Sequence, residues 1–289
     1  MSIHSLKREC ANLVFDNRIP PVLHVKSGDE VAFDCLDASN GQLTAESTVQ
    51  SLGTLNMAEF NHVNGPVYVD GAQPGDTLQV DVLRIENPEW GWSALFPDFG
   101  LLADEFTAPA LKIWKLESDS EEGFAWFDKE KGGNIDTKHV TVGSTLFLPI
   151  EVEGALFSIG DGHAAQGDGE VCGTAIETCM KVTVRLSVRK DKPYTKTPHF
   201  CTPVAKNKSE GEYYCTTGVD SDTREATRSA VRNMIEFLVA EYGLDRVAAY
   251  ILCSVAGDLR MHEVVDMPNY VIGMMMPKSV LGTSSWNKA

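Results

Sequence analysis

The sequence is poor in positive charge. It contains 25 Lys and Arg against 41 Asp and Glu, which gives a formal net charge of −16 at pH 7, and it has no basic run. Binding to nucleic acid or to an anionic membrane surface depends on clustered Lys and Arg side chains. The composition therefore argues against both as partners.

Long apolar runs and cysteine pairs are also missing. No stretch approaches the roughly 18 to 20 apolar residues of a membrane span, and residues 1–10 lack the apolar centre of a secretion signal. The seven cysteines are scattered and form no CxxC pair, so neither a disulfide framework nor a thiolate zinc site is indicated. We expect reduced thiols and a cytoplasmic location.

The pattern that dominates the first two thirds of the chain is that of strands and turns. Apolar residues alternate around Gly-Asp or Gly-Ser turns in residues 20–35, 65–83 and 141–152, and residues 180–189 alternate without interruption. The spacing of these units is too irregular for a repeat architecture. We predict a β-rich, mixed α/β protein whose β body, over approximately residues 1–205, is sandwich-like or barrel-like.

The last third of the chain carries helix signals. Asp222 and Glu225 have the spacing of a capping box, an apolar stripe follows as far as Tyr242, and Gly243 is a typical end, so a helix is predicted over 221–242. A second helix is predicted over 245–255. Approximately 206–289 would form an α/β C-terminal lobe. No linker divides the chain, so we expect residues 1–289 to form a single catalytic unit.

The chemistry is concentrated in the glycine-rich segment 160–173. Five side chains there can bind a metal or transfer a proton: Asp161, His163, Gln166, Asp168 and Glu170. Residues two apart in an extended strand share a face, so the pair Asp161 and His163 and the pair Asp168 and Glu170 would each present two groups together. A metal-binding or proton-transferring site is therefore predicted in this segment.

Other interpretations of this segment are weaker or less specific. Asp and Gly are also the residues of ordinary solvated turns. A calcium-binding EF-hand is disfavoured by the spacing, and a dinucleotide-binding turn is disfavoured because a strand-like run follows where that fold needs a helix. A nucleophilic Cys172 is disfavoured because Asp168 and Glu170 would raise the pKa of its thiol. No Gly-x-Ser-x-Gly elbow is present, which argues against an α/β-hydrolase.

Further polar residues could complete such a site. Asp37 lies where a predicted strand opens into a loop, a position that suits either a functional carboxylate or a simple Asx turn. A polar group at 258–269 includes His262. The remaining histidines of interest stand alone in the sequence, so surface or core roles are predicted for them: His24, His139 and His199.

The sequence resembles the acetamidase/formamidase family almost from end to end. Seven motifs in order carry the resemblance: Ile19-Pro-Pro-Val-Leu, Asp37-Ala-Ser-Asn-Gly-Gln, Asn64-Gly-Pro-Val-Tyr-Val-Asp-Gly-Ala-Gln-Pro-Gly-Asp, Phe99-Gly-Leu-Leu-Ala-Asp-Glu-Phe, Gly132-Gly-Asn-Ile-Asp, Gly160-Asp-Gly-His-Ala-Ala-Gln-Gly-Asp-Gly-Glu and Ala256-Gly-Asp-Leu-Arg. His262 departs from the pattern, which has a small or polar residue there. The resemblance implies a β-rich amidohydrolase that converts short amides such as acetamide or formamide to ammonia and a carboxylate, with zinc or calcium as the associated metal.

A mechanism follows from the two interpretations together. A divalent cation, zinc ahead of calcium, would be held by Asp161, His163 and Asp168 and would polarise the amide and activate water. Glu170 would transfer the proton. The other assigned residues are a second catalytic carboxylate and two substrate-binding amides: Asp37, Gln166 and Asn134.

Two alternatives stay open at this point. The same residues would suit a hydrolase of small lactams, which the resemblance also includes, or a non-catalytic domain with a structural cation. Exposed strand edges and the statistics of oligomers favour a homodimer.

Overall fold

The computed structural model describes residues 2–86, 88–116, 124–126, 135–203 and 211–281. Its largest unit is a nine-stranded sheet in which only the first pair of strands is parallel. The strands lie in this order: β1 (Ile3–Leu6), β4 (Asp29–Cys35), β12 (Met180–Arg189), β6 (Thr77–Glu86), β10 (Thr145–Pro149), β13 (His199–Cys201), β14 (Tyr213–Asp220), β16 (Tyr270–Pro277) and β15 (Asp258–Glu263). The lobe boundary predicted near residue 205 falls between the paired strands β13 and β14.

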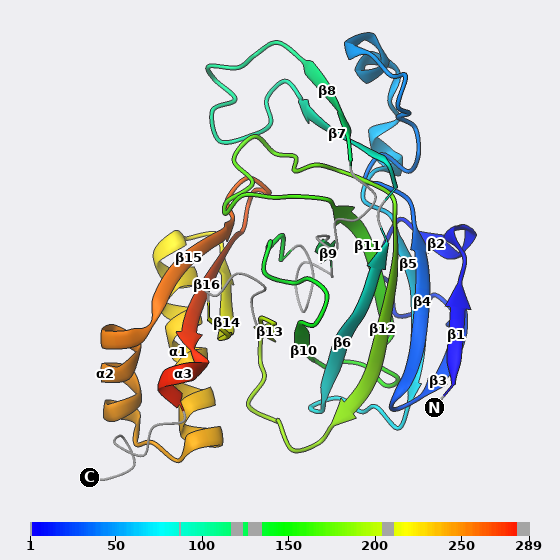
Figure 1. Ribbon diagram of the computed structural model, residues 1–289. Coiled ribbons are helices and arrows are strands. Elements are labelled where there is room, and N and C mark those ends of the chain that lie inside the picture. Colours follow the sequence, from blue (N-terminus) through cyan, green and yellow to red (C-terminus); the bar gives the residue numbers. More distant parts are fainter. Residues whose placement is uncertain (1, 87, 117–123, 127–134, 204–210, 282–289) are drawn as a thin grey trace.

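A second, five-stranded sheet packs against the first (Figure 1). It contains β2 (Ala11–Asn12), β5 (Val63–Asp70), β11 (Phe157–His163) and β9 (Phe124–Trp126), with β3 (Leu23–Lys26) paired to β5. A two-stranded hairpin, β7 (Trp90–Leu95) and β8 (Ala110–Lys115), extends from the top of Figure 1. Three short 3-10 helices complete the β-rich part: η1 (Arg8–Cys10), η2 (Val49–Thr54) and η3 (Met57–Glu59).

The main core lies between the two sheets. The strand predicted over 180–189 is β12, and its buried Val182 and Val184 pair with Phe33 and Val31 of β4. The same cluster includes Val67 of β5 and residues of β11, so the inward-facing side chains of both sheets interdigitate. The prediction of a β-rich, sandwich-like body is confirmed, and the described strands form two packed sheets and not a closed barrel.

Both predicted helices are present. Helix α1 (Thr223–Tyr242) begins after Asp222, whose carboxylate accepts from the amides of Arg224 and Glu225, and ends at Gly243 with a φ of 67°. Helix α2 (Arg246–Ala256) begins after Asp245. The apolar face of α1 packs on β14 and β16 at the left of Figure 1, and α3 (Lys278–Leu281) follows β16. None of the helices in the described ranges is long and apolar enough to cross a membrane.

Candidate active site

Strand β11 carries the first two functional side chains. The ladder between β11 and β9 shifts between Gly160 and His163, and Asp161 within this irregularity has a φ of 50°. A β-bulge of this kind re-aims side chains. As a result, Asp161 and His163 converge, with Oδ1 of Asp161 3.5 Å from Nε2 of His163, and both are buried. The expectation that these two residues face the same place is confirmed.

Glu177 completes this group from a segment that the sequence did not single out. An isolated antiparallel bridge pairs Glu177 with His163, and Oε2 of Glu177 lies 3.1 Å from Nε2 of His163. All three side chains are buried, and one ligand atom from each lies within 4.8 Å of the others. We refer to Asp161, His163 and Glu177 as the pocket group.

Gln166 orients the imidazole of the pocket group. Its side-chain NH₂ donates to the backbone carbonyl of Asp136, so its Oε1 faces Nδ1 of His163 at 3.0 Å as an acceptor. Nδ1 must then carry the hydrogen, which directs Nε2 toward the two carboxylates. Both ends of the Gln166 amide are engaged in this way, whereas the sequence had suggested substrate binding. Asn134, the other predicted substrate-binding residue, lies outside the described residues.

A cavity of about 330 Å³ opens beside the pocket group. Five carboxylates are among its lining residues: Asp136, Asp161, Glu170, Glu177 and Asp266. Glu170 is thus at the cavity, as a proton-transferring residue must be. A larger cavity of about 450 Å³ lies near the N-terminal segment and contains none of the predicted site residues.

The pKa values of three carboxyl groups of this cavity are raised. Burial and the neighbouring acids raise the pKa of Asp136 and of Glu170 well above their ordinary values, and burial raises the pKa of Glu177 to about 7. Burial alone would lower the pKa of His163, but Glu177 and Asp161 raise it well above its ordinary value. The site therefore contains one imidazolium and several acids, so an additional positive charge would stabilise it.

The donor atoms fit a divalent cation. Asp136 Oδ1 is buried without a hydrogen-bond partner among the described residues, although buried polar atoms are normally paired. The backbone is a second indication of a functional site, because three of the acids have positive φ angles: 31° at Asp136, 50° at Asp161 and 47° at Glu170. Strained backbone of this kind gathers at functional sites. An imidazole with two carboxylates is a donor set suited to zinc.

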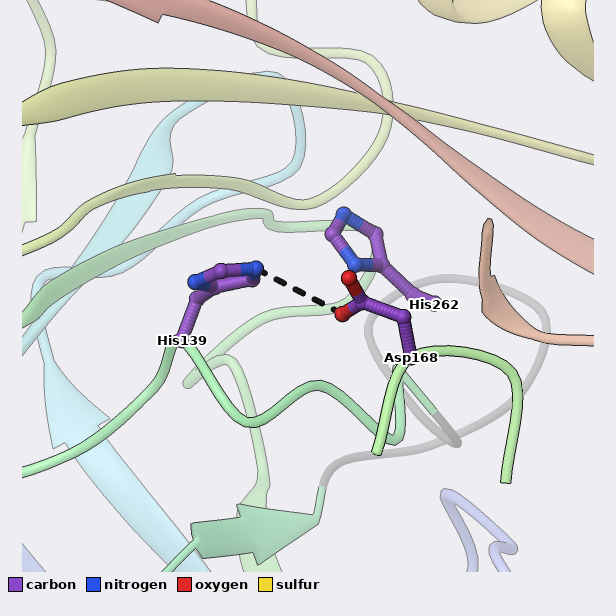
Figure 2. A group of neighbouring side chains, drawn as sticks. All are labelled: His139, Asp168 and His262. Atoms are coloured by element: carbon purple, nitrogen blue, oxygen red, sulfur yellow. Dashed lines mark ion pairs between the residues drawn. The ribbon is translucent and has the colours of Figure 1, made fainter. Parts of the chain in front are cut away.

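Asp168 belongs to a different group. Its Oδ2 accepts from Nη1 of Arg260 at 3.0 Å and lies 3.3 Å from Nζ of Lys138, while its Oδ1 lies 3.6 Å from Nε2 of His139. His262 lies beside His139 and Asp168 (Figure 2). We refer to His139, Asp168 and His262 as the anchoring group, because it ties the loop before Glu170 to strand β15.

The predicted ligand set Asp161, His163 and Asp168 is therefore not brought together as one group. Gly169 has a φ of 90° and Glu170 a φ of 47°, so the chain turns between Asp168 and Glu170 and the expected alternation of an extended strand does not apply. Asp168 points to β15, whereas Glu170 points to the cavity. His139, which stands alone in the sequence, is in fact a partner of Asp168.

His262 has a packing role in the anchoring group. Its Nδ1 lies 3.1 Å from Oγ1 of Thr137, and its ring occupies the space that a Cβ atom at Gly273 would need. Burial and the charge of His139 lower the pKa of His262 to about 3, so the ring is neutral. The imidazole of His262 is thus accommodated by Gly273 on the neighbouring strand β16.

Asp37 is buried and fully engaged by donors. Its Oδ1 accepts from the backbone amide and hydroxyl of Ser39 and from Nε1 of Trp92 at 3.1 Å. Cys179 donates to its Oδ2 at 3.6 Å. The contact with Ser39 is an Asx turn, and the contact with Trp92 fixes one wall of the cavity, which Asp37 itself does not line. The geometry therefore gives Asp37 a supporting position.

Sequence reasoning missed three residues of the site. Glu177 lies in a run without any motif, whereas Asp136 is the last residue of the motif Gly132-Gly-Asn-Ile-Asp and had a visible signal. His62 precedes β5, is buried, and has no hydrogen-bond partner for either ring nitrogen among the described residues. Burial lowers its pKa, while Asp37 and Asp161 oppose that effect.

The fold and site define a β-rich enzyme with buried acids that line a cavity and an imidazole beside them, and comparisons with known proteins identify the class. The chain is 24% identical to the formamidase of Methylophilus methylotrophus, over 91% of this chain and 87% of the relative. Its structure superimposes on an acetamidase from Bacillus halodurans with a TM-score of 0.85 at 27% identity, covering 96% of this chain and 100% of the other.

A predicted acetamidase/formamidase from Thermoanaerobacter tengcongensis gives a TM-score of 0.87 at 26% identity and covers 99% of both chains. The protein is an amidase. The sequence profile of the Acetamidase/Formamidase family matches residues 4–124 and 127–283, so this chain belongs to that family.

Proposed function

We propose that this amidase hydrolyses the C–N bond of linear amides of the acetamide and formamide type, releasing ammonia and a carboxylate, with the help of a divalent cation. The observation that supports this most directly is the pocket group, whose two carboxylates and one imidazole are buried beside a cavity of about 330 Å³. The related enzyme of M. methylotrophus is named a formamidase, which supports the substrate class.

Asp161, His163 and Glu177 would hold the cation, with zinc proposed ahead of calcium. Zinc accepts imidazole nitrogen and carboxylate oxygen in sites with three protein ligands, whereas calcium prefers six to eight oxygens. When bound, such a cation supplies Lewis acidity, which polarises a carbonyl group and lowers the pKa of water toward neutrality. Gln166 keeps Nε2 of His163 available by accepting from Nδ1.

Glu170 is the proposed proton carrier. Hydrolysis forms a C–O bond with water and breaks the C–N bond, so one water proton must move to the departing nitrogen. The buried carboxylate of Glu170 lines the cavity, and burial raises its pKa well above the ordinary value, so it can hold a proton between these two steps. Its acidic neighbours Asp136 and Asp266 line the same cavity.

Replacing Glu170 by Gln tests this role. We expect acetamide turnover by the zinc-loaded enzyme to fall about 100-fold or more, the usual contribution of a general acid or base. The exposed Glu46→Gln is the matched control and should keep wild-type turnover. Turnover of Glu170→Gln within about threefold of wild type would contradict the assignment.

We also propose a homodimer. Helix α2 exposes a contiguous apolar face that includes Val247, Ile251 and Val255, and the adjacent edge strand β15 exposes Leu259 and Met261. Contiguous apolar patches mark interaction surfaces, and an unpaired edge strand adds free backbone groups. A second copy would cover both. Light scattering should give twice the mass of 31.6 kDa for the wild type, and a monomer would contradict the proposal.

A cytoplasmic location is proposed from the thiols. All seven cysteines are free, and none is placed to bridge another. Reduced cysteines in this number suit a reducing compartment. Mass spectrometry of protein isolated with its thiols blocked should find seven modified cysteines, and a disulfide would argue against this location.

A further inference from the structure

The cavity is lined by two chemically different sets of side chains. Besides the carboxylates, its lining includes a set of apolar side chains: Phe60, Trp92, Phe96, Phe99 and Met57. Phe60 packs edge-on against Trp92 and Phe96, with ring centroids 6.5 and 6.1 Å apart. We refer to these rings as the aromatic wall, which adjoins the acids where the backbones of Trp92 and Glu177 pair.

Only part of the aromatic wall is buried in the protein core. Trp92 is fully buried and packs with Ala38 and Leu43, whereas Phe60, Phe96 and Phe99 are half-buried, and Met57 is exposed. Apolar rings that face a cavity while remaining partly accessible are the surface that ligand pockets present to an apolar group. The wall therefore has area left for a ligand to cover.

The cavity is too large for acetamide alone. Acetamide displaces about three waters, or roughly 90 Å³ at about 30 Å³ per water. A cation and a water molecule add a similar volume at the acidic side. The cavity measures about 330 Å³, close to the lower limit of pockets that enclose drug-sized ligands. Space for a phenyl ring or a chain of several methylenes remains beside the aromatic wall.

The charges select against acidic acyl groups. Asp136, Glu170 and Asp266 face the cavity, and no Lys or Arg lines it among the described residues. A carboxylate at the far end of a substrate's acyl chain would find no cationic side chain to pair with there and would be buried among other acids. The acyl group that the cavity fits is thus apolar and uncharged.

We propose that the preferred substrates are primary carboxamides with a phenyl-sized apolar acyl group, bound with the amide at the acids and the acyl group against Phe60 and Phe96. This inference rests on the proposed amidase function and specifies its substrate. Burial of each additional methylene in an apolar pocket can raise kcat/KM by about tenfold or more. Acetamide would then be a small substrate that leaves most of the wall uncovered.

The test compares kcat/KM of the zinc-loaded enzyme for acetamide, hexanamide, phenylacetamide and the monoamide of adipic acid. We expect phenylacetamide and hexanamide to exceed acetamide at least about tenfold, and the adipic monoamide to fall about tenfold below hexanamide. In Phe96→Ala the ratio of phenylacetamide to acetamide should fall about fivefold or more, because the ring that contacts the acyl group is gone. The exposed Phe106→Ala, which does not line the cavity, is the matched control and should keep the ratio.

Failure of the acyl preference can be distinguished from failure of the proposed amidase function. If acetamide is hydrolysed with a kcat/KM equal to or above those of hexanamide and phenylacetamide, the acyl preference is overturned while the amidase function stands. An unchanged ratio in Phe96→Ala likewise overturns the role of the aromatic wall. If none of the amides is hydrolysed, the proposed function fails, and this inference fails with it.

Discussion

The pocket group and the anchoring group contain the same kinds of side chain but opposite charge balances. In the pocket group, two carboxyl groups share one imidazole and further acids lie nearby, so acidic groups outnumber cationic ones. In the anchoring group, the single carboxylate of Asp168 is surrounded by Arg260, Lys138 and His139. A cation would be attracted to the first and repelled from the second.

This difference shows that a cluster of histidines and acids does not by itself indicate a metal site. Within each group, the three ligand atoms lie within 4.8 Å of one another, so distance alone does not show which group suits a metal. The surrounding charge distinguishes the two groups, because Asp168 is already paired with cationic side chains of the protein. The anchoring group instead connects the loop before Glu170 to β15, through the pair of Asp168 with Arg260 and the bond from the Gly169 amide to the His262 carbonyl.

The strongest test of this contrast replaces one histidine in each group. His163→Gln should lose bound zinc and lower kcat/KM for acetamide about 1000-fold, because the substituted side chain removes the only nitrogen ligand of the pocket group. His139→Gln should keep one zinc per chain. Plasma mass spectrometry of dialysed protein measures both, and zinc loss in His139→Gln alone would reverse the assignment.

A smaller effect is expected when the anchor itself is removed. Asp168→Asn should leave zinc in place but lower kcat about tenfold or more, because the loop that positions Glu170 loses its tie to Arg260 and small displacements of catalytic groups are costly. The free energy of unfolding should fall by only about 1 kcal/mol, since these charges are partly exposed. Asp191→Asn, which breaks the ion pair with Arg189 outside the site, is the control. Wild-type kcat in Asp168→Asn would show that the anchor does not serve Glu170.

The third test concerns the pH dependence of stability. His262 has its pKa lowered to about 3 by burial and by His139, below the value of about 6.5 in an unfolded chain. The unfolded state therefore binds more protons in this window, and the stability that neutral His262 provides is present above pH 6.5 and is lost as the pH falls toward 3.

His262→Gln should flatten this loss by up to about 1.4 kcal/mol per pH unit, the contribution of one proton. Chemical unfolding of the wild type and the variant at a series of pH values between 4 and 7 measures the slopes. Equal slopes would show that His262 is not held neutral in the folded protein.

The sequence predicted the strands and helices well because their signals are local. The alternation in β12 and the caps of α1 at Asp222 and Gly243 depend on residues that are neighbours in the chain. The rule that residues two apart share a face assumes an extended chain, which neither pair in the glycine-rich segment has. Asp161 and His163 still meet, through the bulge at Asp161, whereas the positive φ angles of Gly169 and Glu170 send Asp168 and Glu170 apart.

Glu177 could not be predicted by any local rule. It reaches His163 because the two segments on either side of the loop return alongside each other, with backbone bonds between Ala164 and Ile176 and between Ile176 and Ala165. Such pairing depends on where the loop turns, which no residue pattern near Glu177 encodes. The family resemblance marked the segment 160–170 but not this partner.

The left-handed backbone at Asp136, Asp161 and Glu170 sets a limit on how the protein can be made more heat-resistant. Each such residue costs of order 1 to 3 kcal/mol that glycine would not. A library screened only for survival at high temperature would therefore be drawn to glycine at these three positions, and its winners would lose cavity carboxyl groups, among them those that we propose for cation binding and proton transfer. Any thermostabilising campaign on this enzyme must score turnover alongside melting.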